Sequence, residues 1–114
     1  MKQTLLIAIG CFFMSIAVQA QDFSAFQSKQ LIHRGDTLPY RILYPEGYDP
    51  AGSYPVLFFL HGSGERGNDN QKQLVHGGKL FLEDSIRSAF PAIVIFPQCP
   101  TDSYWSNVSM LSMA

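Results

Sequence analysis

The sequence has little clustered charge and almost no cysteine. Its 114 residues include eight Lys and Arg and nine Asp and Glu, without a run of basic side chains. A nucleic acid or an anionic membrane surface is recognised by a basic patch, so the sequence predicts no partner of either kind. Its two cysteines are Cys11 and Cys99. They are too few for a disulfide-stabilised domain.

Long apolar runs are also absent, except at the N-terminus. Met1 to Thr4 is short and positively charged, and an apolar stretch follows from Leu5 to Val18. Val18-Gln19-Ala20 then places small or apolar residues at the −3 and −1 positions of a cleavage site. This pattern predicts a signal peptide over residues 1–20, cleavage after Ala20, and a secreted or periplasmic mature chain over 21–114. The apolar stretch is too short to predict a membrane span.

Each cysteine allows a second interpretation, as a lipid-attachment site or as a catalytic nucleophile. Cys11 follows Ile9-Gly10 and could mark a lipoprotein signal, but cleavage there would leave a second apolar run behind. Cys99 is then the only cysteine of the mature chain and has no internal disulfide partner. Because no activating base stands beside it in Pro-Gln-Cys-Pro, we interpret Cys99 as structural rather than nucleophilic.

The rest of the chain is organised around Val56 to Gly67, VLFFLHGSGERG. Five apolar residues lie between Pro55 and the first glycine of a polar loop. A short apolar run with such boundaries predicts a strand buried on both faces, as in a parallel sheet. The glycines of the loop allow the main chain to turn tightly and to approach a ligand. Sites of α/β proteins lie at this carboxyl end of the strands.

One interpretation of the loop is a dinucleotide site. Gly62, Gly64 and Gly67 satisfy G-x-G-x-x-G, and Glu83 lies near the distance of a ribose-binding acid. However, the polar run 68–73 lacks the apolar stripe of the helix that this motif opens. Glu83 also falls in a predicted helix rather than at the end of a second strand.

A second interpretation depends on His61. An apolar strand followed by His-Gly and small residues resembles the loop of α/β-hydrolases that supplies half of the oxyanion hole. Fixed N–H groups stabilise the negative oxygen of a tetrahedral intermediate, and loss of one donor costs about 3–4 kcal/mol. We predict the N–H groups of Ser63 and Gly64 as donors. A third interpretation is a glycine-rich turn that only joins a strand to a helix.

The remaining elements predict an α/β architecture. Alternating apolar residues indicate a hairpin of 27–33 and 37–44 around Arg34-Gly35-Asp36. The region from Gln71 predicts a short helix or turn and then a helix over 80–88, interrupted between them by Gly77-Gly78. Residues 92–96, AIVIF, predict another buried strand. A hairpin that leads into parallel strands with helices between them is typical of an α/β sheet.

Several segments together resemble secreted α/β-hydrolase esterases. They are FLHGSGERGNDN, QLVHGG, FPAIVIFPQCP and Trp105, and the likeness runs from about Leu31 to Trp105. The related branches are described as predicted peptidase, carboxylesterase, polyhydroxybutyrate-depolymerase-like and feruloyl-esterase-like. The resemblance implies hydrolysis of small-molecule or polymer esters by a Ser-His-Asp triad without a cofactor. It assigns the loop His61-Gly62-Ser63-Gly64 to the oxyanion region.

The sequence departs from this family in lacking G-x-S-x-G, the turn that carries the nucleophile. Leu111-Ser112-Met113 is the nearest match, but it has Met110 and Ala114 in place of the two glycines. We therefore expect an incomplete α/β-hydrolase fold that carries the oxyanion loop, needs the remainder of the hydrolase domain, and exposes one edge of the Val56 strand. The alternative is a small secreted ligand-binding module without catalysis.

The polar residues near the loop have simpler interpretations. We expect His61 to hydrogen-bond its own turn, and we predict no metal site because His33 and His76 lack ligand spacing. Glu65 and Arg66 either anchor the loop, line an acyl pocket or are solvated. Asp69 is positioned to cap the next helical turn. Asn107-Val108-Ser109 is a possible glycosylation triplet.

Overall fold

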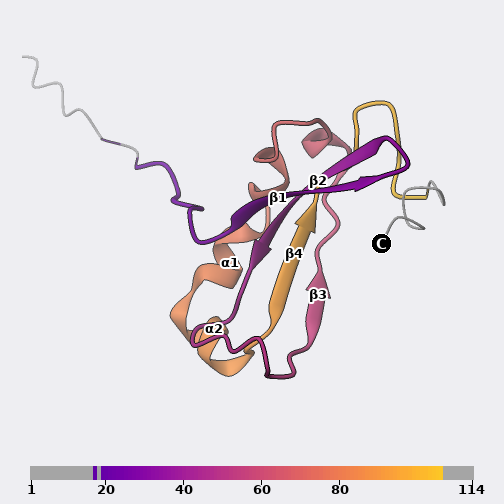
Figure 1. Ribbon diagram of the computed structural model, residues 1–114. Coiled ribbons are helices and arrows are strands. Elements are labelled where there is room, and N and C mark those ends of the chain that lie inside the picture. The colour runs from indigo at the N-terminus through magenta and orange to yellow at the C-terminus, as the bar shows by residue number, and fades with distance from the viewer. Residues whose placement is uncertain (1–16, 18, 107–114) are drawn as a thin grey trace, which may run out of the picture.

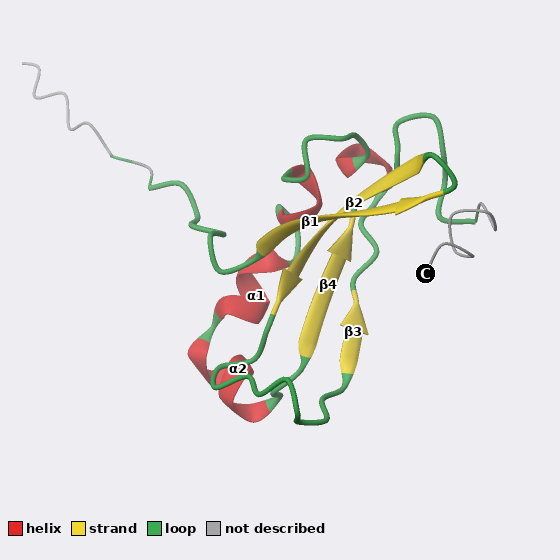
Figure 2. Ribbon diagram, in the orientation of Figure 1, coloured by secondary structure: helices red, strands yellow, loops and turns green. Residues whose placement is uncertain are grey.

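The protein is described here by a computed structural model of Ala17 and residues 19–106. It forms a four-stranded sheet with short helices packed on one side (Figures 1 and 2). In chain order the elements are β1 (Gln27–His33), β2 (Asp36–Leu43), β3 (Val56–Phe58), the 3₁₀ turns η1 (Ser63–Glu65) and η2 (Lys72–Leu74), α1 (Gly78–Leu82), α2 (Asp84–Ala89) and β4 (Ile93–Pro97).

The predicted hairpin is confirmed. β1 and β2 pair antiparallel from Gln27 opposite Ile42 to His33 opposite Asp36. Arg34 and Gly35 form the connection with φ values of 50° and 86°. Two positive φ values in a two-residue loop match the twist of the flanking strands.

The parallel part of the sheet is also present. The strand order is β1-β2-β4-β3, with β4 antiparallel to β2 and parallel to β3. The connection from β3 to β4 carries the loop after β3 and all four helical segments. Parallel strands need such a crossover, which brings their carboxyl ends to the same edge of the sheet. The loop after β3 and the segment after β4 therefore meet there.

The single helix predicted over 80–88 is wrong. Glu83 has an extended conformation, with φ −65° and ψ 128°, and separates α1 from α2. It ends one helix and begins the next, because its N–H donates to Leu80 O and its carbonyl accepts from Ile86 and Arg87. Gly78, predicted to interrupt a helix, instead begins α1, and a Cβ atom there would lie 2.8 Å from the Phe23 ring.

The core lies between the helices and one face of the sheet. Phe96 is fully buried, and its ring lies 4.6 Å from that of Phe59, 5.3 Å from that of Phe26 and 5.7 Å from that of Phe81. Leu43, Leu74 and Val94 complete the buried cluster. The Phe96 ring on β4 is therefore contacted from α1, from the loop after β3 and from the segment before β1.

The expectation that the Val56 strand is buried on both faces is wrong. Val56 and Phe58 are 51% and 57% exposed. They pair with Ile93 and Ile95, so these four side chains share the face opposite the helices. β3 has β4 as its only neighbour among the described strands, and the expected exposed edge is confirmed for the described part of the chain. The apolar run predicted the strand correctly but not the number of elements that cover it.

Several predictions fall outside the described residues. These are the apolar stretch of the signal peptide, Cys11, the glycosylation triplet at Asn107 and the serine at 112. Among the helices of residues 19–106, none is long and apolar enough to cross a membrane.

Candidate oxyanion loop

The loop after β3 and the segment after β4 lie side by side at the carboxyl end of the parallel strands. The N–H of Gly67 donates to Cys99 O at 3.0 Å and closes the far end of the loop against this segment. Gly67 has φ +153°, a conformation that side-chain-bearing residues rarely adopt. The glycine therefore permits the backbone conformation in which the loop bonds to the segment after β4.

His61 shapes the start of the loop, as predicted. Its side chain is buried, its Nδ1 lies against Gly62 O, and its Nε2 accepts the Cys99 N–H at 2.9 Å. An Nε2 that accepts a main-chain N–H places the ring proton on Nδ1, which donates to the carbonyl. Both ring nitrogens are thereby occupied, so His61 has no free nitrogen for a general base.

Trp105 completes the packing of this turn. Its indole N–H donates to His61 O at 2.8 Å, and its ring meets the imidazole edge-on at 4.9 Å between centroids. The segment after β4 thus contacts both the main chain and the side chain of His61. The His-Gly turn is therefore held by three hydrogen bonds: from the His61 ring to Gly62 O, from the Cys99 N–H to the ring, and from Trp105 to His61 O.

The predicted donors, Ser63 and Gly64, are the first two residues of η1. Gly62 before them is extended, and the turn closes with the Glu65 N–H donating to Gly62 O at 3.3 Å. The first N–H groups of a helical turn have no partner within the turn. Within the described residues neither Ser63 N–H nor Gly64 N–H has a hydrogen-bond acceptor. Both remain available to a ligand.

A small cavity of about 90 Å³ lies beside these residues, lined by Gly62, Ser63, Arg66, Cys99, Tyr104 and Trp105. Arg66 anchors the loop, because its guanidinium donates to Ser63 O at 3.0 Å and to Ser103 O at 3.2 Å. The same group lies 5.0 Å from the centre of the Tyr104 ring, within the range of a cation–π contact. Arg66 thus both fixes the loop and forms part of the cavity wall.

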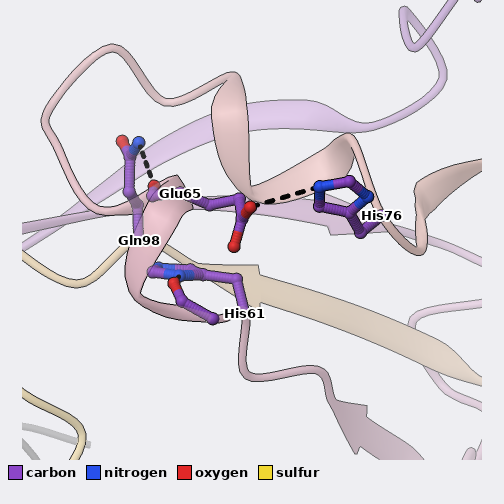
Figure 3. Close-up of polar contacts among 5 residues, drawn as sticks. His61, Glu65, His76 and Gln98 are labelled. Carbon is purple, nitrogen blue, oxygen red and sulfur yellow. Dashed lines mark hydrogen bonds and ion pairs between the residues drawn. The ribbon is translucent and has the colours of Figure 1, made fainter.

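Glu65 connects the loop to the helical segment. Its carboxylate pairs with His76 Nε2 at 3.3 Å, while its main-chain carbonyl accepts from Gln98 (Figure 3). The side chain of Glu65 is 16% exposed and that of His76 is 73% exposed. Glu65 is thus held through its main-chain carbonyl by Gln98, and its carboxylate contacts the surface side chain of His76, which is charged only when protonated. His33, at the end of β1, is exposed as well.

Gln98 is the residue near the loop that the sequence did not single out. It is fully buried, and its side-chain amide donates to Glu65 O at 3.1 Å and to Asp69 Oδ1 at 2.8 Å. Its side-chain oxygen accepts the Asn70 N–H at 2.7 Å. The only sequence feature that marks Gln98 is its polarity between an apolar strand and the following Cys-Pro. Residues near it in the sequence do not identify its bonding partners, which lie far away in the chain.

Asp69 has the capping role that was predicted. Its Oδ1 accepts the N–H groups of Gln71 and Lys72 at 3.1 and 3.2 Å, ahead of η2. Burial acts to raise the pKa of this carboxyl, but the hydrogen bonds from Gln98, Gln71 and Lys72 and the Lys72 charge outweigh it and lower the pKa. The carboxylate is therefore the form that the fold prefers.

Cys99 has the properties of a structural cysteine. It is 1% exposed, and burial raises the pKa of its thiol; Arg66 opposes this shift and Asp102 adds to it. A buried neutral thiol is a poor nucleophile. Within residues 19–106, His, Cys, Asp and Glu side chains form no group of three that could hold a metal ion.

The dinucleotide interpretation does not fit this geometry. The glycine motif contains the three-residue turn η1 and is followed by the three-residue turn η2, so it opens no long helix. Glu83 lies between α1 and α2 and not at the end of a strand. The pyrophosphate site of that motif requires a helix that begins within the glycine sequence.

Comparison with known proteins shows a similarity to an esterase of known structure. No protein-family model matches the sequence, and a search of curated proteins also found no match. Among solved structures, the crystal structure of a thermostable esterase matches with a TM-score of 0.68 and 33% sequence identity. The match covers 77% of this chain and 24% of the esterase chain, so this chain spans about a quarter of that protein's length. The chain therefore has an esterase-like α/β fold over the part that the match covers.

Proposed function

We propose that this chain is the part of an exported serine hydrolase that carries the oxyanion loop of its active site. The reaction is hydrolysis of carboxylic esters or related acyl compounds. The observation that carries the proposal is a pair of unpaired N–H groups, on Ser63 and Gly64, beside a cavity in an esterase-like fold. Donors fixed before the substrate arrives stabilise the oxyanion without reorganisation.

The other catalytic groups belong to the remainder of the hydrolase domain. His61 is fully engaged in the turn and Cys99 is buried, so neither supplies the nucleophile or the base. In the proposed enzyme a serine attacks the ester carbonyl, a histidine takes its proton, and the loop accepts the negative charge on the carbonyl oxygen. This chemistry uses protein groups alone and needs no cofactor.

The uncovered face of β3 supports the same proposal. Val56, Phe58 and Leu60 are each about half exposed, at 51%, 57% and 49%. Further strands and a covering layer would bury them, as expected of a sheet in a larger α/β domain. The remainder of the hydrolase domain is the proposed partner of this surface.

A proline substitution tests the loop directly. Ser63→Pro removes one N–H, and the extended Gly62 before it is the conformation that a following proline favours. Because that N–H has no partner among the described residues, the substitution costs no internal hydrogen bond. In the hydrolase that contains this chain, we expect kcat on p-nitrophenyl acetate to fall about 10²- to 10³-fold.

Ser63→Ala is the matched control for this experiment. It removes the hydroxyl and keeps the N–H, so kcat should stay within a fewfold of the parent enzyme. Equal losses in Ser63→Pro and Ser63→Ala would instead assign a role to the side chain. Full activity of Ser63→Pro would contradict the oxyanion assignment.

The coding sequence after the Ala114 codon provides the second test. We expect a further strand, a G-x-S-x-G turn, and later Asp and His in the same reading frame. The 114-residue product alone should not hydrolyse p-nitrophenyl acetate. A stop codon there, together with a soluble monomer that binds carboxylates without turnover, would favour the ligand-binding module.

Export is part of the proposal and has its own measurement. We expect the protein to be secreted or periplasmic, with the signal peptide cleaved after Ala20. N-terminal sequencing of the exported protein should begin at Gln21. A protein that keeps Met1 in the cytoplasmic fraction would contradict this assignment.

A further inference from the structure

Two consecutive residues after β4 hold the oxyanion loop at several points. Cys99 bonds through its N–H to His61 Nε2 and through its carbonyl to the Gly67 N–H. Gln98 bonds through its side chain to Glu65 O, at the end of η1. The loop is therefore fixed by Cys99 at its start and at its end, and in between by Gln98 together with the Arg66 bonds to Ser63 O and Ser103 O.

Every hydrogen-bonding group of the Gln98 side-chain amide has a partner. Its two N–H donors go to Glu65 O and Asp69 Oδ1, and its oxygen accepts the Asn70 N–H. Its main-chain N–H donates to Pro39 O at 2.9 Å, so the residue is also tied to β2. Because the side chain is fully buried, any rotation would leave polar groups unpaired and away from water.

The bond to Glu65 O acts on the residues that carry the proposed donors. Ser63, Gly64 and Glu65 form the single turn η1, and the carbonyl that Gln98 holds is that of its last residue. Figure 3 shows the dashed contact between Gln98 and the main chain of Glu65, on the opposite side from the contact to His76. Rotation of that peptide unit would carry the rest of so short a turn with it.

We propose that Gln98 is a positioning residue of the oxyanion loop, which fixes the orientation of η1 through its bonds to Glu65 O and the Asp69-Asn70 turn. This inference rests on the proposed function for its catalytic meaning. A site held by a buried and fully bonded second layer keeps the geometry that transition-state stabilisation requires.

Two substitutions remove the proposed contacts in different ways. Gln98→Glu keeps the size of the side chain and an acceptor for the Asn70 N–H, but it loses the amide donors: the ionised carboxylate donates neither bond and the protonated carboxyl donates one at most. Gln98→Leu removes all three bonds. Gln73→Leu is the matched control, because Gln73 is also buried and also bonds to Asn70, through Asn70 Oδ1, but makes no bond to Glu65 or to the rest of η1.

Hydrogen–deuterium exchange, measured by mass spectrometry on the whole chain, reports the loop without an activity assay. The sensitive probes are the Glu65 N–H, which bonds to Gly62 O, and the Gly67 N–H, which bonds to Cys99 O. Loss of the Gln98 donors should speed exchange of the peptide over 62–67 about tenfold, while the hairpin over 27–43 changes less than twofold. Gln73→Leu should not show this local increase.

The exchange rates of the loop and of the hairpin together test the positioning role of Gln98. Faster exchange confined to the loop in both Gln98 variants supports a positioning role. Unchanged loop exchange overturns it, and so does an equal increase in the hairpin or in Gln73→Leu. If Gln98→Leu fails to fold, Gln98→Glu decides alone. Global unfolding of both variants would show that Gln98 stabilises the whole fold and would overturn the local role.

An activity measurement separates this inference from the proposed function. In the hydrolase that contains this chain, Gln98→Glu should lower kcat about tenfold or more with KM within twofold, as misplaced donors act in the transition state. A normal kcat beside a disturbed loop overturns the positioning role. If no form of the enzyme hydrolyses esters but exchange responds as predicted, the proposed function fails and the structural role of Gln98 stands.

Discussion

The carboxyl end of the parallel strands and their outer face differ in which side chains are buried from water. At the carboxyl end, His61 and Gln98 are buried polar side chains whose bonding atoms all have partners. On the outer face, Val56 and Phe58 are apolar and half exposed. Within the described residues, the chain completes its loop with its own side chains but leaves the outer face of β3 half exposed.

The cavities show the same difference. The small one beside the loop has a guanidinium and aromatic rings in its wall. A larger apolar groove of about 500 Å³ lies at the opposite end of the strands, lined by residues that include Val56, Leu57, Leu80, Ile86, Phe90 and Val94. Size alone would select the groove as the site. The unpaired donors and the bonded network select the loop.

The largest expected effect contrasts the two faces of the sheet. Phe96→Ala removes a fully buried ring and should lower the free energy of unfolding by about 3–5 kcal/mol. Phe58→Ala, at 57% exposed, should change it by less than about 1 kcal/mol. Urea denaturation of both variants measures the difference. Similar losses would mean that the outer face is covered in solution, for instance by self-association.

The next effect compares two histidines. His61→Ala leaves the buried Cys99 N–H without an acceptor and should cost about 1–3 kcal/mol. His76→Ala removes a largely exposed partner of the Glu65 carboxylate, charged only when protonated, and should cost less than about 1 kcal/mol. Thermal or urea unfolding gives both values. A larger loss at His76 would contradict the view that the turn depends on the buried ring.

A charge on the free edge tests the uncovered strand. We expect the chain to self-associate through the free edge of β3. Val56→Lys should reduce the free energy of association by about 1 kcal/mol, because like charges on facing strands repel. Ile32→Lys on β1 is the control, because Ile32 is 69% exposed on the other edge of the sheet. Analytical ultracentrifugation at several concentrations measures the change. Equal effects of the two lysines would show a general effect of charge.

The smallest effect concerns pH. Because the pKa of Asp69 is lowered in the folded state, its carboxylate stabilises the fold above the ordinary pKa of an aspartate. That contribution disappears as the pH falls from about 4 through the lowered pKa. Asp69→Asn should therefore make the stability between pH 7 and pH 3 less dependent on pH. An unchanged pH profile would show that Asp69 contributes nothing to acid sensitivity.

Local patterns predicted the parts of the fold that depend on near neighbours. Alternation through Leu38, Tyr40 and Ile42 identified β2, and the apolar run at 92–96 identified β4. The break at Glu83 was missed, because the apolar spacing continued across it. The exposure of Val56 was missed as well, because an apolar run does not reveal how many elements cover it.

The sequence by itself determined the hairpin, the strand that leads into the His-Gly loop, and the residue types of that loop. Each depends on contacts between residues close in the chain or on the conformations that glycine allows. Only the tertiary structure decided that Gln98 and Cys99 hold the loop. Their partners at 61, 65, 67, 69 and 70 lie about 30 residues earlier, and only the crossover between parallel strands brings the two segments together.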